Sequence, residues 1–451
     1  MRIVCIFLVA VMFLASCGKN NEKAGPSNEF EGKSFPSKMD HLLGKFYAND
    51  KFMGSIAVSK KGEDVYSKAI GYSDINSKKV SSTDTKYRGG SITKMFTSAL
   101  IFNAVEDKKL SLDTTLKGFF PSIVNASKIT IRQLLNHRSG IPSFTKDPLF
   151  WEIRTENITR SSLLNLISEY PSNFEPDSQH EYSNSNYFLL SQILESVFQQ
   201  TYADLLQKEI LEPLALQKTY TGQSISNQNN EAYSYVFEDC WKIFQETDLS
   251  IALGSGDIVT TPQDLNTFTT ALFNKQLISA DSLKNMTMIR DNVGFGIFPY
   301  SHKNTHGFGH GGTIDGFHSI SIYFPHEQLA VSIMSNAIDY NINNLLTHIL
   351  KLYFDEPFEL LSFSAVKLTS AELAKYVGVY EGEGPGKFTI TQRDDVLYAQ
   401  LNDSFIDPLL YLGDHKFINE ETGANFIFDP DANTLGLEQS GVADIYMFNK
   451  K

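Results

Sequence analysis

The placement of the strand-forming runs limits the fold of this sequence more than any other feature. Two runs rich in β-branched and aromatic residues, within residues 52–74, flank the turn KKGE, and two more, at 318–325 and 329–336, flank the turn HEQ. Between these pairs, up to about residue 290, apolar residues recur mostly at helical spacing. We therefore predict an α+β fold in which the two ends of this segment form one antiparallel β-sheet, flanked by helices and carrying an inserted helical subdomain.

The composition changes after this segment. The run INNLLTHILKLYF predicts a closing helix, and from residue 368 onward six short strand-like runs recur about every ten residues between turn signals. These runs predict a separate small all-β barrel or sandwich. The predicted domains are therefore 39–360 and 368–451.

The N-terminus has the pattern of an exported lipoprotein. In MRIVCIFLVAVMFLASC, Arg2 precedes an apolar run that is too short to span a bilayer, which predicts a signal peptide over residues 1–16. The letters LASC resemble the bacterial lipobox, whose cysteine carries lipid, and the polar residues 17–38 predict a flexible tether. We expect Cys17 to anchor the chain to a membrane of the bacterial cell envelope, facing the periplasm or the cell exterior. The alternative is plain secretion, with Cys17 lost in the signal.

The charge of the chain argues against nucleic acid as a partner. With 39 basic and 52 acidic residues the formal net charge is −13, so no overall positive field attracts a polyanion. His302, His306 and His310 are four residues apart, but glycines break any helix between the last two and no carboxylate-rich motif is near. We therefore predict no metal and no cofactor.

Chemistry is expected first in the stretch GGSITKMFTSALIF, residues 89–102. Residues three apart lie on the same face of a helix, so Ser91 and Lys94 point the same way from its first turn, where free backbone amides favour developing negative charge. A serine and a lysine in this arrangement can act as nucleophile and base if burial keeps the lysine neutral part of the time. The alternative is a helix-opening serine beside a lysine that extends to solvent.

Two further stretches favour the first interpretation. QHEYSNSNYFLL places residues 182–184 in a polar turn before a helix, and GFGHGGTIDGFHSISIYFP places residues 310–312 directly before a strand. In this order the three sites resemble the S-x-x-K, Y-x-N and H-x-G triplets of the serine β-lactamase and penicillin-binding-protein superfamily. The tyrosine is typical of the class C β-lactamase-like branch, and the resemblance covers roughly residues 39–355. The last domain is similar to the lipocalin-like modules that accompany many such hydrolases.

The resemblance implies a role for each matching residue. Ser91 would be the nucleophile that accepts the acyl group, and Lys94 and Tyr182 would share the work of taking its proton and giving it to the leaving group. The resemblance leaves open which of the two is the resting base, because such a pair titrates together. Asn184 would hold the acyl-side carbonyl of the substrate. His137 is expected to hold loops by hydrogen bonds rather than to act as a base.

The same resemblance implies substrate-binding positions at His310, Gly312 and Thr313, with the backbone amides of Ser91 and Thr313 forming an oxyanion hole. His310 departs from the β-lactamases, which usually have a lysine there, because histidine is mostly neutral at pH 7. We therefore expect a serine hydrolase that cleaves ester or amide bonds of small-molecule or peptide substrates through an acyl-enzyme. A D-alanyl-D-alanine carboxypeptidase or a weak β-lactamase, acting on a lactam carbonyl, is the alternative. A penicillin-binding sensor without turnover is an alternative of another class.

Overall fold

The structure, a computed structural model, describes residues 30, 32–357, 363, 368–382, 386–402, 406–419, 422–438 and 445–451. The predicted signal peptide and Cys17 lie outside the described residues. Within these ranges, no helix combines the length and the apolar character that crossing a bilayer requires.

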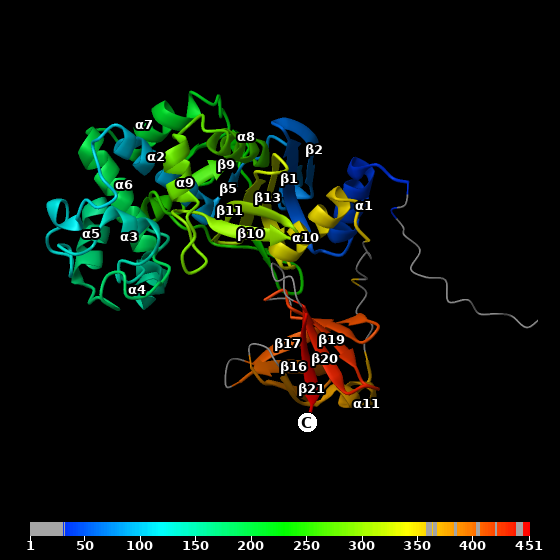
Figure 1. Cartoon of the computed structure of the whole chain (residues 1–451). Helices are drawn as coiled ribbons and strands as arrows, with labels where there is room; N and C mark the ends of the chain where they lie inside the picture. The colour runs from blue at the N-terminus through cyan, green and yellow to red at the C-terminus, as the bar shows by residue number, and fades with distance from the viewer. Residues whose placement is uncertain are drawn as a thin grey trace, which may run out of the picture.

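One antiparallel sheet forms the centre of the first domain, with strand order β10-β11-β12-β13-β1-β2 (Figure 1). The bounds are β1 Phe52–Lys60, β2 Glu63–Ile70, β10 Phe298–His302, β11 Thr305–Ile314, β12 Phe317–Phe324 and β13 Leu329–Ile338. β1 and β13 pair directly, with Val58 opposite Val331 and Ile56 opposite Ile333. Strands from the two ends of the domain therefore lie side by side, and the predicted α+β sheet is confirmed.

Helices cover both faces of this sheet. Their bounds are α1 Phe35–Ala48, α2 Thr93–Glu106, α8 Pro262–Phe273 and α10 Ile342–Tyr353. α1 and α10 pack on one face and α8 on the other, where α2 lies against α8 through the stacked rings of Phe96 and Phe268. Successive strand residues point to opposite faces, so Val331 joins the apolar cluster under α1 and α10, and Ala330 joins the cluster under α2 and α8. Because both faces are covered, every residue of β13 except the last is buried.

The first helix begins inside the predicted tether, which corrects the predicted boundary at residue 38. Residues 35–38 form the first turn of α1, where Pro36 is favourable because that turn has no intrahelical use for its missing N–H. Lys38 is buried and pairs with Asp355, 317 residues further along the chain. A polar stretch thus becomes part of the folded domain through a partner that the local sequence does not reveal.

A helical subdomain is inserted in the chain between the early and late strands of the sheet, and Figure 1 shows α3 to α6 gathered away from α1 and α10. The remaining helices are α3 Ile131–Leu135, α4 Pro148–Ile153, α5 Arg160–Glu169, α6 Asn184–Phe198, α7 Tyr202–Leu206 and α9 Ala280–Met286. Short strands also occur in this region, which the sequence predicted as mostly helix and loop. They are β4 Lys79–Val80, β5 Tyr87–Arg88, β6 Tyr220–Thr221, β7 Tyr235–Phe237, β8 Trp241–Ile243 and β9 Ile258–Thr260. β7 joins the central sheet through a parallel pair with β13, and β3 Tyr72–Asp74 lies within the strand-forming runs predicted at 52–74.

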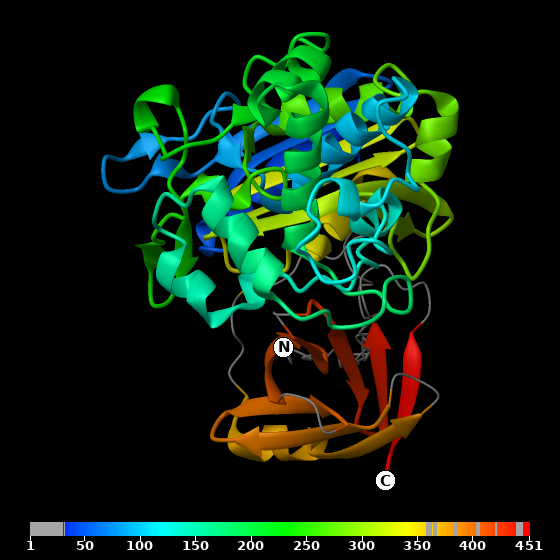
Figure 2. The same cartoon turned by 90° about the vertical axis from the view of Figure 1, so that its left-hand side faces the viewer.

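The C-terminal residues form a closed antiparallel barrel, in which β14 pairs with β21 (Figure 2). Its elements are α11 Ser370–Leu373, β14 Gly378–Gly382, β15 Phe388–Arg393, β16 Val396–Leu401, β17 Ile406–Gly413, β18 Lys416–Ile418, β19 Asn425–Asp429, β20 Thr434–Glu438 and β21 Tyr446–Lys450. The predicted small all-β barrel is confirmed, with β14 and β20 in addition to the six predicted runs. Asn344 of α10 donates a hydrogen bond of 3.0 Å to the Gly423 carbonyl and so links the two domains.

Candidate active site

Ser91 lies on a single 3₁₀ turn, Gly90–Ile92, that leads directly into α2. Gly90 has φ = 53°, a left-handed conformation that favours glycine, and a Cβ there would come 3.0 Å from the Thr313 backbone nitrogen. The turn therefore requires glycine both for its backbone angle and for the close approach of β11. This geometry places Ser91 at the start of a buried helix, with its backbone against the neighbouring strand.

Lys94 lies one helical turn further and is fully buried. Its ammonium group donates three hydrogen bonds, to Ser91 Oγ at 3.1 Å, Asn184 Oδ1 at 2.7 Å and the Ser255 carbonyl at 2.7 Å. The Asn184 side chain is oriented by a bond from its Nδ2 to Thr145 Oγ1 at 3.0 Å. Burial holds the pKa of Lys94 well below its ordinary range.

The three acceptors around Lys94 are not equivalent. Asn184 Oδ1 and the Ser255 carbonyl can only accept a hydrogen bond, whereas a serine hydroxyl can also donate one. When Lys94 becomes a neutral amine, it has one lone pair, and Ser91 is the partner among the three that can donate to it. The array is therefore arranged for a proton to pass from Ser91 to Lys94.

Tyr182 completes the cluster around Lys94. Its ring centre lies 4.9 Å from Lys94 Nζ and 4.3 Å from the ring centre of His137. Its buried hydroxyl makes no hydrogen bond of ordinary geometry within the described part of the chain, although Ser91 is close enough to act on its pKa. Burial raises the pKa of Tyr182 above its ordinary value, and the Ser91 hydroxyl opposes this rise.

His137 holds the turn that carries Tyr182. Its Nδ1 accepts a hydrogen bond of 3.1 Å from the Ser183 backbone N–H, directly before α6 begins at Asn184. Burial and the nearby Lys94 keep the pKa of His137 well below 6.5, so the ring is a neutral acceptor. The ring supports the tyrosine and the start of α6, in line with the predicted loop-holding role.

The backbone amides of Ser91 and Thr313 lie on segments that touch. A Cβ at Gly312 would come 2.0 Å from the Gly89 carbonyl oxygen and 3.0 Å from the Ser91 nitrogen, so this contact is possible only for glycine. Ser319 Oγ, on β12, donates to the Gly89 carbonyl at 2.7 Å and fixes the turn against the sheet. Two backbone amides on facing segments are a suitable site for an oxyanion.

The structure places His310 to Gly312 inside β11 rather than before a strand, which corrects the sequence prediction. Glycine has a low strand propensity, so the local sequence of this segment does not predict a strand. Here they are needed for close backbone approach, because a Cβ at Gly309 would lie 2.0 Å from the Ser321 carbonyl oxygen.

His310 is buried near Lys94. Its Nδ1 donates to the Gly311 carbonyl, its Nε2 has no partner among the described residues, and its ring packs edge-on against Phe298 at 4.9 Å. Burial, with the nearby Lys94, lowers the pKa of His310 to about 3. His302 and His306 bond elsewhere, to Glu356 and Ser301.

Asp257 supports the turn that presents the Ser255 carbonyl to Lys94. Its Oδ1 accepts the Gly254 N–H at 2.9 Å, and its Oδ2 has no partner among the described residues. Burial raises the pKa of Asp257 from 3.8 to about 7, and the surrounding backbone amides and the charges of Arg160 and Lys94 oppose the rise. A buried carboxyl group whose charge acts on Lys94 therefore lies behind the array.

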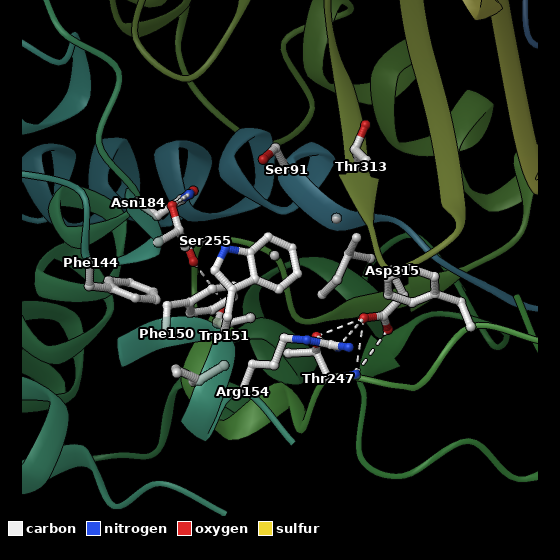
Figure 3. Close-up of a pocket in the computed structure, with 17 residues that line it drawn as sticks. Ser91, Phe144, Phe150, Trp151, Arg154, Asn184, Thr247, Ser255, Thr313 and Asp315 are labelled. Carbon is white, nitrogen blue, oxygen red and sulfur yellow. Dashed lines mark hydrogen bonds and ion pairs between the residues drawn. The ribbon is translucent and has the colours of Figure 1, made fainter. Parts of the chain in front are cut away.

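A cavity of about 290 Å³ opens beside Ser91 (Figure 3). Its lining residues are Gly90, Ser91, Phe144, Thr145, Phe150, Trp151, Arg154, Asn184, Phe244, Thr247, Ile251, Ala252, Ser255, Gly256, Thr313, Ile314 and Asp315. Ser91, Asn184 and Thr313 face it together, although they come from the turn before α2, from α6 and from β11. A substrate in this cavity would contact the serine and the oxyanion segment at once.

The two charged side chains that line the cavity belong to one ion-paired cluster. Asp315 accepts from Arg88 Nη1 at 3.0 Å, Arg154 Nη1 at 3.2 Å and Thr247 Oγ1 at 2.7 Å, and Arg88 also pairs with Glu246. The side chains of Arg88 and Asp315 are each 1% exposed. The cavity floor therefore presents paired rather than free charge.

Residues 48–341 match the Beta-lactamase family. The chain belongs to this family. Protein flp of Staphylococcus aureus is 25% identical over 310 residues, which span 65% of this chain and 61% of that protein. The solved structure of D-amino acid amidase from Ochrobactrum anthropi SV3 in complex with L-phenylalanine amide is similar, with 25% identity and a TM-score of 0.64 over 71% of this chain and 99% of that one. An octameric penicillin-binding protein homologue from Pyrococcus abyssi, 22% identical, has a similar fold with a TM-score of 0.65 over 92% of this chain and 99% of that one.

Within this beta-lactamase family fold, the predicted residues Ser91, Lys94, Tyr182 and Asn184 come together, and Thr313 faces them. His310 is near but buried at 4% exposure, and it does not line the cavity. Sequence reasoning missed Ser255, Asp257 and the aromatic wall of the cavity. The stretch GSGDIVTT, with a carboxylate between a glycine and an apolar strand, was the one local signal for Asp257.

Proposed function

We propose that this protein is a serine hydrolase that cleaves ester or amide bonds through a covalent acyl-enzyme on Ser91. The observation that carries the proposal is the 3.1 Å contact between Lys94 Nζ and Ser91 Oγ, in a buried array where Ser91 is the partner able to donate a proton to the neutral lysine. The similarity to a D-amino acid amidase supports an amide among the bonds cleaved.

The reaction follows from these positions. Lys94 accepts the Ser91 proton as Oγ bonds to the substrate carbonyl carbon, and the carbonyl oxygen takes the electron pair beside the backbone amides of Ser91 and Thr313. When the bond to the leaving alcohol or amine breaks, that group takes a proton from Lys94 or Tyr182. The acyl group stays on Ser91 until water attacks its carbonyl carbon and gives one proton to Lys94. That proton passes to Ser91 Oγ as the bond between Oγ and the acyl carbon breaks, which releases the acid and restores the serine.

The directions of the two pKa shifts favour Lys94 as the group that accepts the proton first. Burial lowers the pKa of Lys94 and so favours the neutral amine, which is the basic form. Burial raises the pKa of Tyr182 and so favours the neutral phenol, which can donate but not accept readily. We therefore assign the first proton transfer to Lys94 and delivery of a proton to the leaving group to Tyr182, which then takes back the proton held by Lys94 so that both groups are neutral before water attacks.

The charges at the site favour neutral esters and amides over substrates with a carboxylate next to the reacting bond. His310 is uncharged because its pKa lies at about 3, and the guanidinium of Arg154 is paired with Asp315. A lysine at position 310 would offer a cation, and this chain has none there. D-alanyl-D-alanine peptidase and β-lactamase activity therefore rank below ester and amide hydrolysis.

The test compares hydrolysis of p-nitrophenyl butyrate with that of nitrocefin by the purified protein. We expect faster turnover of the ester, loss of both activities in Ser91→Ala, and labelling of Ser91 by a fluorophosphonate mapped by mass spectrometry. Ser98→Ala, two turns along the same helix, is the matched control and should retain labelling. Full ester hydrolysis by folded Ser91→Ala would reject the proposal. Faster turnover of nitrocefin than of the ester would indicate that β-lactams, rather than esters and amides, are the substrate class. A stoichiometric burst without turnover would point to a penicillin-binding sensor instead.

We propose further that Cys17 carries lipid and holds the protein on a membrane of the cell envelope. The support is the LASC pattern after a short apolar run. In a bacterial host, the wild-type protein should sediment with membranes and incorporate an alkyne fatty acid, and Cys17→Ala should do neither. Membrane association of Cys17→Ala equal to that of the wild type would contradict this proposal.

A further inference from the structure

We propose that the cavity beside Ser91 binds an uncharged aromatic acyl group, with Trp151 stacked against its ring. This inference rests on the proposed function and names the class of substrate. An acyl group is the part of the substrate that stays bonded to Ser91 through the reaction, so the cavity that begins at Ser91 has to hold it. Three observations support this proposal: the aromatic side chains in the cavity wall, the pairing of the charged residues that line the cavity, and the exposure of Trp151 to solvent.

Four aromatic side chains form one part of the cavity wall. Phe144, Phe150, Trp151 and Phe244 line it, together with the aliphatic side chains of Ile251 and Ile314. Its volume is about 290 Å³. A dry protein cavity of about 150 Å³ is enough to bind benzene, so this one has room for a ring and a short linker to the carbonyl carbon on Ser91.

The cavity has no free charge to offer a substrate. Arg154 and Asp315 are the charged residues that line it, and they pair with each other at 3.2 Å. Asp315 is further satisfied by Arg88 and Thr247, and Arg154 donates to the Gln245 carbonyl at 2.9 Å. A carboxylate or an ammonium group placed in this cavity would lose its hydration and would have to compete with the existing ion pair of Arg154 and Asp315, which disfavours charged acyl groups.

Trp151 differs from the other aromatic residues that line the cavity because it is largely exposed to solvent. The residue is 65% exposed although it lines the cavity, and the α4 helix that carries it contains no buried residue. The Arg154 guanidinium lies 5.5 Å from its ring centre, and in Figure 3 the indole is drawn between Ser91 and Arg154. The Arg154 guanidinium orients the indole from one side. A substrate ring on the cavity side would cover apolar surface of the indole that is otherwise exposed to solvent.

The binding test uses Ser91→Ala, which prevents turnover, combined with Trp241→Phe. The sequence has two tryptophans, so emission then reports on Trp151 alone. Phenylacetamide should change this emission and bind with a Kd about tenfold or more below that of acetamide, because of the added ring contacts. Phenylacetate, which has the same ring with a negative charge, should bind about tenfold more weakly than phenylacetamide. Equal affinity for phenylacetamide and acetamide would overturn the proposal.

The kinetic test compares kcat/KM for p-nitrophenyl phenylacetate and p-nitrophenyl acetate, which differ only in the acyl group. We expect a ratio of about ten or more in the wild type, a ratio near one in Trp151→Ala, and the wild-type ratio in the control Trp241→Ala. A wild-type ratio near one, with hydrolysis that still depends on Ser91, would overturn this inference and leave the proposed function intact. Selective binding of phenylacetamide without any hydrolysis would overturn the proposed function but would still support a binding pocket for an aromatic group.

Discussion

Replacing Asp257 with asparagine should make the stability of the hydrolase domain less sensitive to rising pH. Asp257 is buried, and its pKa is raised from 3.8 to about 7. A raised pKa means that the folded state favours the protonated form, so this contribution to the unfolding free energy is complete below pH 3.8 and is lost as the pH rises through 7. A difference of roughly three pKa units corresponds to about 4 kcal/mol in all, of which roughly 2 to 3 kcal/mol falls between pH 5 and pH 8.5.

Asparagine keeps the oxygen that accepts the Gly254 N–H but cannot ionise. The new amide group lies where Oδ2 has no partner among the described residues, so the substitution has a cost of its own, and this cost does not depend on pH. The quantity to measure is therefore how the stability difference between variant and wild type changes from pH 5 to pH 8.5.

Urea unfolding followed by tryptophan emission is a suitable assay, because Trp151 and Trp241 both lie in the hydrolase domain. With a urea slope of about 2 to 3 kcal/mol per molar, the difference between the two unfolding midpoints should shift by roughly 1 M in favour of the variant as the pH rises from 5 to 8.5. Asp50→Asn, at an exposed turn before β1, is the control and should show no such shift. A stability difference that stays the same at both pH values would refute the reasoning.

The same substitution should also change the pH dependence of activity. The Asp257 charge raises the pKa of Lys94, which burial lowers. Without that charge Lys94 should lose its proton at lower pH, and the acidic limb of the kcat/KM profile should move to lower pH. The titratable groups near Lys94, which include His137, His310, Tyr182 and Tyr187, are unchanged in the variant. Their effects on the pH profile are therefore the same in the variant and in the wild type. An unchanged acidic limb would mean that Asp257 does not tune Lys94.

Three further predictions concern the array and its surroundings. Lys94→Met should lower kcat for p-nitrophenyl butyrate by about 10²- to 10⁴-fold, and Tyr182→Phe should lower it by a smaller factor. Circular dichroism spectra of both variants check that they are folded. Gly312→Ala should lower kcat strongly, because its Cβ would lie 2.0 Å from the Gly89 carbonyl oxygen and displace the turn of Ser91; normal kcat would contradict the tight contact. Asp315→Asn should lower the unfolding free energy by about 3 kcal/mol in urea, because it leaves Arg88 and Arg154 without their shared carboxylate, and a loss below about 1 kcal/mol would refute this.

Local patterns carried a large part of the fold. The two late strands and the opening strand pair were readable because alternation and tight turns are properties of neighbouring residues, and the structure pairs them as predicted. The barrel was predictable for the same reason, except at β14 and β20, whose runs GVYEG and TLGLE contain glycine. β11 was missed because its glycines serve close backbone contacts with other segments, which no local propensity encodes.

The relation between Ser91 and Lys94 followed from the sequence alone, because three residues of helix place both side chains on one face whatever surrounds them. What makes that lysine a plausible base was decided by the tertiary structure. Its other acceptors, Asn184 and Ser255, lie 90 and 161 residues away along the chain, and its burial depends on the packing of helices and strands around it. The cavity wall around Trp151 and the ion pairs of Asp315 likewise join segments far apart in sequence. Spacing within one helix is a property of the chain, whereas a pKa and a cavity arise only when distant segments exclude water together.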